Sequence, residues 1–333
     1  FWKPGIANRP QGAWQRAYVG GAMKLQQLRF LIEVVDSGLN VTAAADRLFT
    51  SQPGVSKQVR LLEDEIGIRI FERSGKRFTG LTRAGEAIVK AARRVLLEAE
   101  NLKAVSEELR DEEAGTLTVA TTHAQARYVL PRVVAEFIRR YPRVRLSISE
   151  GDPHRVAALV QRGEADLGIA TESLANAPGL VSLPAYRWNH CVIVPPGHAL
   201  IGAAPLTLQG LAGIPLITYD PAFSGRTRID DGFRRAGVTP NLVLTAVDSD
   251  VIKTYVGLGL GVGIVAEMAV DPQKDAGLVV LPAGHLFGAN TTRIAFRRGA
   301  FPRRFALDFA QILSPTLTPN TVESATREGG ESY

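Results

Sequence analysis

The chain of 333 residues contains a single cysteine, two methionines and five histidines. Because Cys191 has no second cysteine to pair with, an internal disulfide is excluded, and the sequence is compatible with a reducing cytoplasm, where we expect the protein to act. Cysteines and histidines at metal-ligand spacing are missing, so we expect no metal ion and no cofactor. The most apolar stretch, at about 258–270, is interrupted by glycines and carries Glu267, which excludes a membrane span and a membrane partner.

The sequence also lacks the short motifs of common enzyme classes. Glycines alternate at positions 257, 259, 261 and 263, but a dinucleotide-binding fingerprint needs a third glycine three positions after the second. The run also leads from a predicted helix into a predicted strand, which is the reverse of the required order. No GxxxxGK[ST], HExxH or GxSxG pattern occurs. We therefore predict that the chain is not an enzyme and has no catalytic residues.

The first 22 residues lack an initiator methionine and show no continuous apolar core of a secretory signal. Met23 reads as the natural start, so we expect residues 1–22 to be a non-native or disordered extension. With 45% apolar residues, the remaining chain is long enough for two or three hydrophobic cores.

Residues 39–60, LNVTAAADRLFTSQPGVSKQVR, have the pattern of two helices joined by a sharp turn. Asn40 or Thr42 can cap an alanine-rich first helix, and Ser51 can cap a second helix with Pro53 in its first turn. Apolar residues recur at helical spacing in the second helix, at Val55, Val59 and Leu62. This pattern fits either a helix-turn-helix for the major groove of DNA or an ordinary amphipathic helix hairpin.

The polar residues of the second helix and of the turn before it are the candidates for DNA contact, because such side chains reach base edges and phosphates where a helix enters the groove. They are Thr50, Ser51, Gln52, Pro53, Ser56, Lys57 and Arg60.

Residues 68–81, IRIFERSGKRFTGL, contain two short apolar segments on either side of Ser74 and Gly75, which predicts a small hairpin or wing. Positions 69–83 hold five arginines and lysines against one glutamate. Such a cluster suits DNA phosphates, although a run of charge is more often a solvated face. The candidate contacts here are Arg73, Lys76 and Arg77.

A long helix is predicted from position 82 to about position 109. Its small and apolar residues follow one another at spacings of four and three: Ile88, Ala92, Val95, Ala99, Leu102, Ser106 and Leu109. A helix of about 27 residues is roughly 40 Å long, and a small head cannot cover such a stripe. We predict that this helix pairs with a second copy of the chain; packing against the chain's own second domain is the alternative.

Beyond residues 111–116, predicted strands and helices alternate, which indicates a parallel α/β domain. A first set has strands at 117–122, 144–150 and 165–171 and helices at about 124–141 and 153–163, and a second set has strands at 215–218, 241–247 and 261–266. A strand at 291–298 and a helix at 303–313 resemble a return to the first lobe. Two such lobes joined by hinge strands would enclose a small ligand.

Several long blocks of the sequence resemble LysR-type transcriptional regulators over essentially all of residues 23–315. They include TSQPGVSKQVRLLEDEIGIRIFERSGK, ATTHAQARYVLPRVV, YRWNHCVIV and DSDVIKTYVGLGLGVGIVA. Within the family, the chain is most similar to the CysB-like branch, which regulates cysteine biosynthesis and sulfur assimilation. The resemblance implies an N-terminal α winged helix-turn-helix with a linker helix, followed by a two-lobed α/β effector domain like that of periplasmic binding proteins, and commonly a homotetramer.

The resemblance also implies a division of the chain. The expected parts are residues 23–81 for the DNA-binding domain, 82–110 for the dimerisation helix, 115–183 with 286–315 for effector lobe I, 184–285 for effector lobe II, and 316–333 for a flexible tail. The expected partners are promoter double-stranded DNA, further copies of the chain in a homodimer or homotetramer, RNA polymerase and a small anionic effector.

The loop ATTHAQ, residues 120–125, ends a predicted strand and begins a helix, where backbone N–H groups and hydroxyls favour an anion. The resemblance places the effector at this loop and at the facing lobe. The matching positions are Thr122, Ala124, Gln125, Thr171 and Ser224.

Two of these positions depart from close relatives, because Ala124 and Ser224 each stand where those have threonine. The implied effector is an acetylserine-like metabolite, sulfate or thiosulfate, in the control of cysteine biosynthesis, sulfur assimilation or sulfonate use. Another pathway with a different carboxylate effector, or a plain solute-binding protein, are the alternatives.

Overall fold

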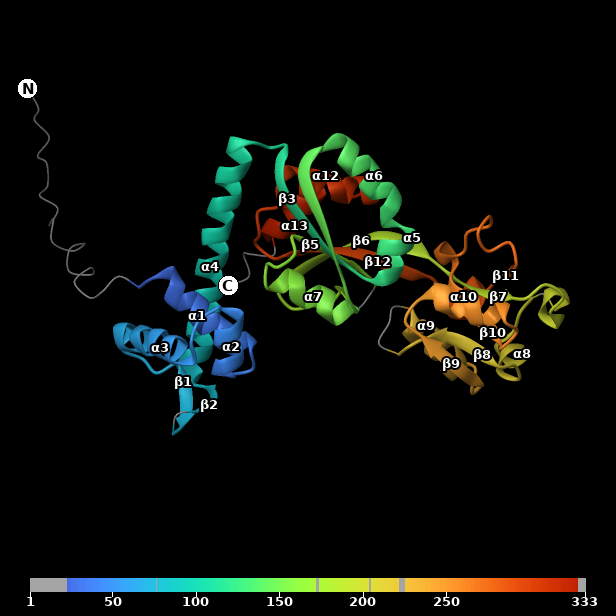
Figure 1. Ribbon diagram of the computed structural model, residues 1–333, viewed down its shortest axis with the longest axis horizontal. Helices are drawn as coiled ribbons and strands as arrows, with labels where there is room; N and C mark the ends of the chain where they lie inside the picture. Colours follow the sequence, from blue (N-terminus) through green and yellow to red (C-terminus); the bar gives the residue numbers. More distant parts are fainter. Residues whose placement is uncertain (1–22, 76, 172–173, 204, 222–224, 329–333) are drawn as a thin grey trace, which may run out of the picture. The chain divides into compact units, whose positions relative to one another are not determined.

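The computed structural model describes residues 23–75, 77–171, 174–203, 205–221 and 225–328. The chain divides into two compact units between Lys103 and Ala104, within one long helix. Each unit is described by itself below, with the element names of Figure 1. In the described residues, no helix is long and apolar enough to cross a membrane.

The N-terminal unit is a helical head with a small antiparallel hairpin. Its elements are α1 (Leu25–Asp36), α2 (Val41–Arg47), α3 (Gln52–Ile66), β1 (Phe71–Ser74), β2 (Arg77–Leu81) and the first part of α4 (Arg83–Arg110). Asn40 caps α2, because its side-chain oxygen accepts hydrogen bonds from the backbone N–H groups of Thr42 and Ala43, both at 3.1 Å. Val55, Val59 and Leu62 are fully buried in one core. The predicted helix pair and hairpin are confirmed.

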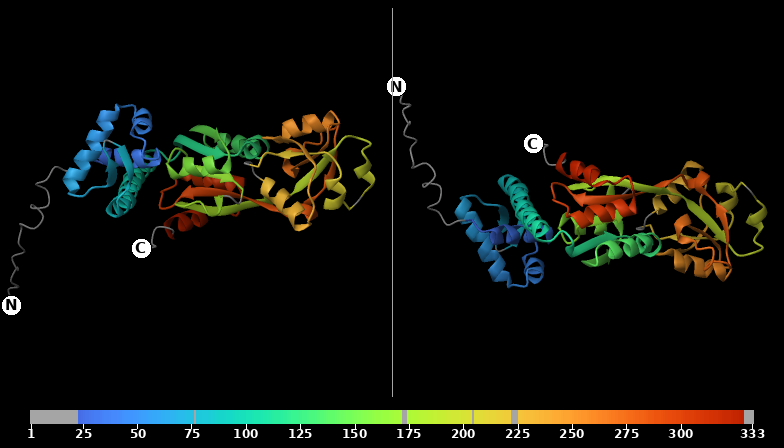
Figure 2. Two further views of the ribbon diagram at one scale, coloured as in Figure 1. Left: turned by 90° about the horizontal axis from the view of Figure 1, so that it is seen from below. Right: turned by 90° about the horizontal axis from the view of Figure 1, so that it is seen from above.

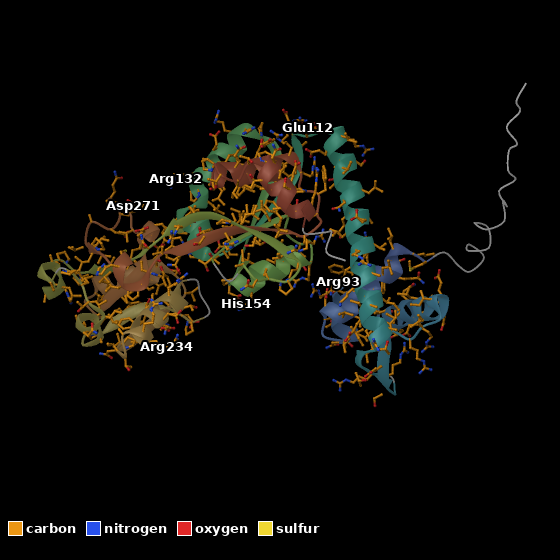
Figure 3. The ribbon with its side chains drawn as sticks, turned by 180° about the vertical axis from the view of Figure 1, so that it is seen from behind. Arg93, Glu112, Arg132, His154, Arg234 and Asp271 are labelled. Atoms are coloured by element: carbon orange, nitrogen blue, oxygen red, sulfur yellow. The ribbon has the colours of Figure 1, made fainter. Side chains whose placement is uncertain are left out.

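The predicted long helix is also confirmed, as α4. Ile88 and Ala92 pack into the core of the head, whereas Val95, Leu102 and Leu109 are 41%, 74% and 83% exposed. The apolar stripe therefore has two parts: its beginning completes the head, and its continuation is left uncovered. On the opposite side, Arg93, labelled in Figure 3, pairs with the Asp36 carboxylate at the end of α1.

The second unit contains two lobes, each built on a mixed sheet (Figure 2). Lobe I has the strand order β4-β3-β5-β12-β6, in which β3 pairs in parallel with β4 and β5, and β12 is antiparallel to β5 and β6. Its elements are β3 (Ala114–Thr121), α5 (His123–Tyr128), α6 (Leu130–Arg140), β4 (Arg143–Glu150), α7 (Pro153–Gln161), β5 (Leu167–Ala170), β6 (Leu180–Trp188), β12 (Asn290–Arg297), α12 (Arg304–Leu313) and α13 (Pro319–Glu328).

Side chains alternate across the lobe I sheet, so the sheet has a core on each face. Leu117 and Val119 of β3 pack with α6 and α12, whereas Ala120 packs with Val156 and Val160 of α7. The parallel pairing of β3 and β5 places their carboxyl ends next to each other, where the loop with Thr122 begins.

Lobe II repeats the plan with the order β11-β7-β10-β8-β9. β8 is parallel to β9 and β10, and β7 is antiparallel to β10 and β11. Its elements are β7 (His190–Val194), η2 (Ala199–Gly202), α8 (Leu208–Ala212), β8 (Leu216–Tyr219), α9 (Arg226–Arg235), β9 (Leu242–Ala246), α10 (Ser249–Gly257), β10 (Val262–Ala266), η3 (Glu267–Ala269), β11 (Val279–Pro282) and α11 (Gly284–Phe287).

The chain crosses between the lobes later than the predicted boundaries at 183/184 and 285/286. β6 stays in the lobe I sheet through Trp188, which pairs with Asn290 at the start of β12, and α11 packs in lobe II through the buried Phe287. The crossings therefore lie at residue 189 and at residues 288–289. β6 and β12 pair from Leu180 to Trp188, with one irregularity between Thr292 and Arg293, so β6 continues past the predicted boundary at 183/184.

Two other expectations differ from the structure. The predicted helix at about 124–141 is two helices that meet at Val129, because Pro131 in the first turn of α6 has no N–H to continue the earlier helix. The predicted flexible tail is wrong for residues 316–328: Thr318 caps α13, and Leu317 and Val322 are buried in the lobe I core. Residues 329–333 and the extension 1–22 lie outside the described residues.

Candidate DNA-binding and effector sites

The second helix of the pair, α3, begins as the sequence predicts. Ser51 caps it, with its hydroxyl oxygen accepting from the Gly54 N–H at 3.3 Å, and Pro53 lies in the first turn. Residues four apart share one side of a helix, so Gln52, Ser56 and Arg60 form one row, which Pro53 and Lys57 flank. Of the seven predicted residues, Ser56 is half-buried and the rest are exposed: Thr50, Ser51, Gln52, Pro53, Lys57 and Arg60.

The row of polar residues is partly ordered before any partner arrives. The Gln52 side-chain amide donates to the Ser56 hydroxyl at 3.3 Å. Because Val55 and Val59 point into the core, rotation of α3 is prevented and the polar face stays outward. This face has the donors and acceptors needed to read a major groove.

The turn between α2 and α3 contains a residue that the sequence pattern did not single out. Phe49 has a φ of +51° and its residue surface is 98% exposed. Leu39 has a φ of +65°, but it packs against the core of the head. The left-handed conformation of Leu39 is thus offset by packing, whereas that of Phe49 is not.

In the wing, Arg73 has a structural role. Its guanidinium pairs with the Glu63 carboxylate of α3 and lies over the Phe78 ring, 5.0 Å from the ring centroid. Glu63 also accepts hydrogen bonds from the N–H groups of Ile70 and Phe71 at 2.8 and 3.2 Å, which fixes the hairpin to α3. The interaction with Glu63 reduces the charge that Arg73 can offer to a phosphate.

The remaining cations of the wing include the other two predicted contacts, Arg77 and Lys76. Arg77, at the start of β2, is exposed, and Lys76 lies outside the described residues. Arg69 and Arg83, at the ends of the hairpin, are also exposed. The wing therefore keeps an exposed cationic character without Arg73.

The candidate effector loop follows β3. Thr122 occupies the cap position of α5, but its hydroxyl makes no capping bond. Thr122 is 2% exposed, and among the described residues its hydroxyl has no hydrogen-bond partner. The hydroxyl of the preceding Thr121 instead donates to the Ile169 carbonyl at 3.1 Å. A buried hydroxyl without a partner is costly, so a ligand or a water at Thr122 would be stabilising.

Gln125, one turn further along α5, is held on both sides of its amide. Its nitrogen donates to the Thr292 hydroxyl at 3.2 Å, and its oxygen accepts from the Tyr186 hydroxyl. Thr292 also accepts from the Trp188 indole N–H at 3.1 Å. Tyr186, Trp188 and Thr292 come from β6 and β12, far from Gln125 in sequence, and no local pattern pointed to them.

Thr171, at the end of β5, is 4% exposed, and the structure brings it next to the Thr122 loop because β3 and β5 are parallel neighbours. The Thr122 N–H donates to the Ile169 carbonyl at 3.4 Å. Ala124 is half-buried, and Ser224 lies outside the described residues. Four of the five predicted effector residues, Thr122, Ala124, Gln125 and Thr171, thus lie at one edge of the lobe I sheet.

The far end of α5 contacts lobe II. The Tyr128 hydroxyl donates to Asp250 of α10 at 2.9 Å, and the Arg127 guanidinium donates to its other oxygen at 3.2 Å. Burial would raise the pKa of Asp250, but hydrogen bonds from Lys253, Tyr128 and Arg127 hold it below the usual value. A charged carboxylate on lobe II therefore binds α5, the helix that follows Thr122.

A buried histidine lies at the start of β7. His190 is 1% exposed, and its ring makes edge contacts with those of Trp188 and Phe287, at centroid distances of 5.1 and 5.8 Å. Burial lowers the pKa of His190 to about 3, and the charge of Arg228 adds to the effect, so the ring is neutral at pH 7. Burial also raises the pKa of the neighbouring Cys191 thiol to about 12, which makes it unreactive.

His123 lies at the surface, with Nδ1 2.7 Å from a Glu150 carboxylate oxygen. In the part of the chain that the structure describes, no three His, Cys, Asp or Glu side chains are grouped so that they could hold a metal ion.

Comparison with known proteins agrees with both parts of the architecture. Residues 25–86 match the lysR family of bacterial regulatory helix-turn-helix proteins, and residues 110–317 match the LysR substrate binding domain. The chain belongs to the LysR family of transcriptional regulators.

Relatives of this LysR-family regulator match it over nearly their whole length. It is 50% identical to the HTH-type transcriptional regulator SsuR of Burkholderia cenocepacia over 306 residues, which is 92% of this chain and 99% of SsuR. It is 49% identical to CysB of the same organism, over 93% of this chain and 99% of CysB. The crystal structure of the cofactor-binding domain of the Cbl transcriptional regulator superposes with a TM-score of 0.63 at 46% identity, covering 65% of this chain and 94% of that one. The protein is thus a CysB-like transcriptional regulator.

Proposed function

We propose that this LysR-family protein regulates genes of sulfur assimilation, cysteine biosynthesis or sulfonate use in response to a small anionic effector. The similarity to SsuR and CysB, at 50% and 49% identity, supports the pathway. The observation that carries the effector site is the buried, unpartnered hydroxyl of Thr122 beside Gln125 and Thr171. An acetylserine-like metabolite, sulfate and thiosulfate each have oxygens that could accept from these groups.

DNA binding is assigned to the exposed polar face of α3, with Gln52 and Lys57 as base contacts and Arg77 as a phosphate contact. The outward position of these side chains supports this assignment. The ion pair with Glu63 makes Arg73 the weakest of the predicted contacts. We propose that the bound regulator then recruits RNA polymerase at the promoter.

Pairing of two chains is assigned to the exposed part of the α4 stripe. Leu102 and Leu109 expose 74% and 83% of their surface, and such side chains at heptad spacing are buried in a coiled coil. A dimer would present two α3 helices to successive half-sites of a pseudopalindrome, and two dimers would form the homotetramer.

Transmission of the signal is assigned to α5. Its first turn carries Gln125, and its last residues bind Asp250 of lobe II. An effector that shifts α5 would change the contact between the lobes, and a different lobe arrangement would alter the spacing of the DNA-bound heads.

The decisive experiment is calorimetric titration of the full-length protein with sulfate, thiosulfate and N-acetylserine. Thr122→Val, which replaces the hydroxyl by a methyl group, should weaken binding about 10-fold or more, since a hydrogen bond to a charged group contributes roughly 1.5–3 kcal/mol. Thr116→Val, at the exposed opposite end of β3, is the matched control and should bind as the wild type does.

Failure of all three compounds to bind the wild type would refute the effector assignment and favour a LysR-type regulator of another pathway with a different carboxylate effector. DNA binding is tested separately by footprinting on promoter fragments. If the protein protected none of them, the proposed regulatory function would be refuted, and a solute-binding protein would be the alternative.

A further inference from the structure

Two buried polar atoms without a partner lie where the chain crosses between the lobes. In the described part of the chain, four buried side-chain atoms lack a hydrogen bond, namely Thr122 Oγ1, His190 Nε2, Asn290 Oδ1 and Asp308 Oδ1. Asp308 is in an ion pair with Arg304 at 3.3 Å, so its charge is compensated. His190 begins β7, and Asn290 begins β12, so the two are the first residues after the two crossings.

The side chains of His190 and Asn290 form one hydrogen bond with each other. Their Nδ1 and Nδ2 atoms are 3.3 Å apart, and the Asn290 nitrogen donates to the imidazole. In a neutral imidazole whose Nδ1 accepts, Nε2 carries the hydrogen. The pair therefore has an unused donor at His190 Nε2 and an unused acceptor at Asn290 Oδ1.

This count does not depend on the orientation of the Asn290 amide. If the amide were turned so that its oxygen accepted from Nδ1, then Nε2 would become the acceptor and the amide nitrogen the unused donor. In both arrangements the pair lacks one donor partner and one acceptor partner. Both side chains are buried, since His190 is 1% exposed and Asn290 is fully buried, so each unused atom is costly without a partner.

The pair is continuous with the candidate effector site. Trp188 packs on the His190 ring, and its N–H donates to Thr292, which also binds Gln125. Gly225, the N-cap residue of α9, has a φ of +88°, and a Cβ there would lie 2.7 Å from His190 Nε2. Any residue with a side chain would therefore clash with the His190 ring, so only glycine fits this close approach.

We infer that His190 and Asn290 determine effector specificity by binding a group that is both a hydrogen-bond donor and an acceptor, such as the amide or hydroxyl of an acetylated amino acid. The inference rests on the proposed effector function. Sulfate and thiosulfate have acceptors but no donor at neutral pH, so they can satisfy the unused donor of the pair and leave its unused acceptor unpaired. An unpaired buried polar group lowers affinity, which favours the organic effector.

The test is calorimetric titration of the full-length wild type and of His190→Phe with N-acetyl-L-serine and with sodium sulfate. Phenylalanine keeps the aromatic contacts with Trp188 and Phe287 but has no ring nitrogen. The variant should bind N-acetyl-L-serine at least 10-fold more weakly and sulfate within about 3-fold of the wild type. His190→Gln, which restores a donor and an acceptor at similar reach, should recover part of the lost affinity.

Several results would overturn the inference. Unchanged affinity of His190→Phe for N-acetyl-L-serine would mean that a water molecule satisfies the pair. An equal loss for both probes would indicate a general structural role, as would a failure of both His190 variants to fold in thermal melts. Wild-type protein that binds sulfate but not N-acetyl-L-serine would refute the inference and leave the proposed function standing, whereas binding of neither probe would refute both.

Discussion

Replacing Phe49 by glycine should stabilise the DNA-binding head. Phe49 has a φ of +51° in the turn between α2 and α3, and 98% of its surface is exposed. A left-handed conformation costs an L-residue about 1–2 kcal/mol, and glycine adopts it without this cost. Glycine also gives the unfolded chain more conformational freedom, which lowers the free energy of unfolding by about 0.5–1 kcal/mol. The exposed ring contributes almost no burial, so the net gain is about 0.5–1 kcal/mol.

Leu39 provides the matched control because it has a similar backbone and a different environment. Its φ is +65°, but its side chain packs against the core of the head. Leu39→Gly relieves the same strain and loses apolar burial, which for a fully buried leucine contributes about 1.5–3 kcal/mol. The control variant should therefore be neutral or less stable than the wild type.

Differential scanning calorimetry of the intact protein can follow the transition of the head separately from that of the second unit. A change of about 1 kcal/mol moves the midpoint of a domain of 60–100 residues by roughly 4–8 °C. Phe49→Gly should raise the midpoint by a few degrees, and Leu39→Gly should not. A lower midpoint for Phe49→Gly would refute the reasoning, since it would mean that the exposed ring stabilises the fold.

Other changes test other parts of the structure. Asn40→Ala removes the cap of α2 and should lower the stability of the head by about 1 kcal/mol in the same calorimetry; no loss would contradict the capping role. Lys57→Ala should weaken operator binding in gel shifts by about 1–3 kcal/mol if Lys57 contacts bases. An unchanged affinity would exclude Lys57 as a base contact. Asp250→Asn should speed amide exchange in α5, which Asp250 binds through two side chains; equal exchange rates would argue against its coupling to lobe II.

His190 should make folding stability depend on pH. Its pKa is lowered to about 3 in the folded chain, while an unfolded histidine titrates near 6.5. Below pH 6.5 the unfolded chain binds a proton that the folded chain does not, so stability is full at higher pH and falls as the pH falls. The contribution is about 2 kcal/mol between pH 7 and pH 5. Urea unfolding at both values should show this difference in the wild type and not in His190→Phe; an equal pH dependence would show that His190 is not the cause.

The head could be predicted well because its signals are local in sequence. Ser51 and Pro53 mark the start of α3, and the spacing of Val55, Val59 and Leu62 indicates its buried side. The role of Arg73 could not be predicted in the same way, because it depends on Glu63, ten residues away on another element. Charge alone made Arg73 look like a phosphate contact.

Errors in the second unit have two different causes. The start of α13 had a local signal that went unused, since Thr318 and Pro319 form a typical helix start. The positions of the lobe crossings had no local signal in the sequence, because the extension of β6 to Trp188 depends on its pairing with β12, about a hundred residues later. Strand pairing over such a distance leaves no periodic pattern in either segment.

The sequence alone determined the helix pair and hairpin of the head, the long helix, the alternation of strands and helices in the second unit, and the family. Caps, turn residues and hydrophobic spacing act between residues close together in the chain, so these features have local signals. Only the tertiary structure decided which polar groups meet at the lobe crossing. Gln125 and Thr292 are 167 residues apart, and His190 and Asn290 are 100 residues apart. They come together because the packed sheets bring distant strand ends to one place, and their burial there decides which hydrogen bonds are missing.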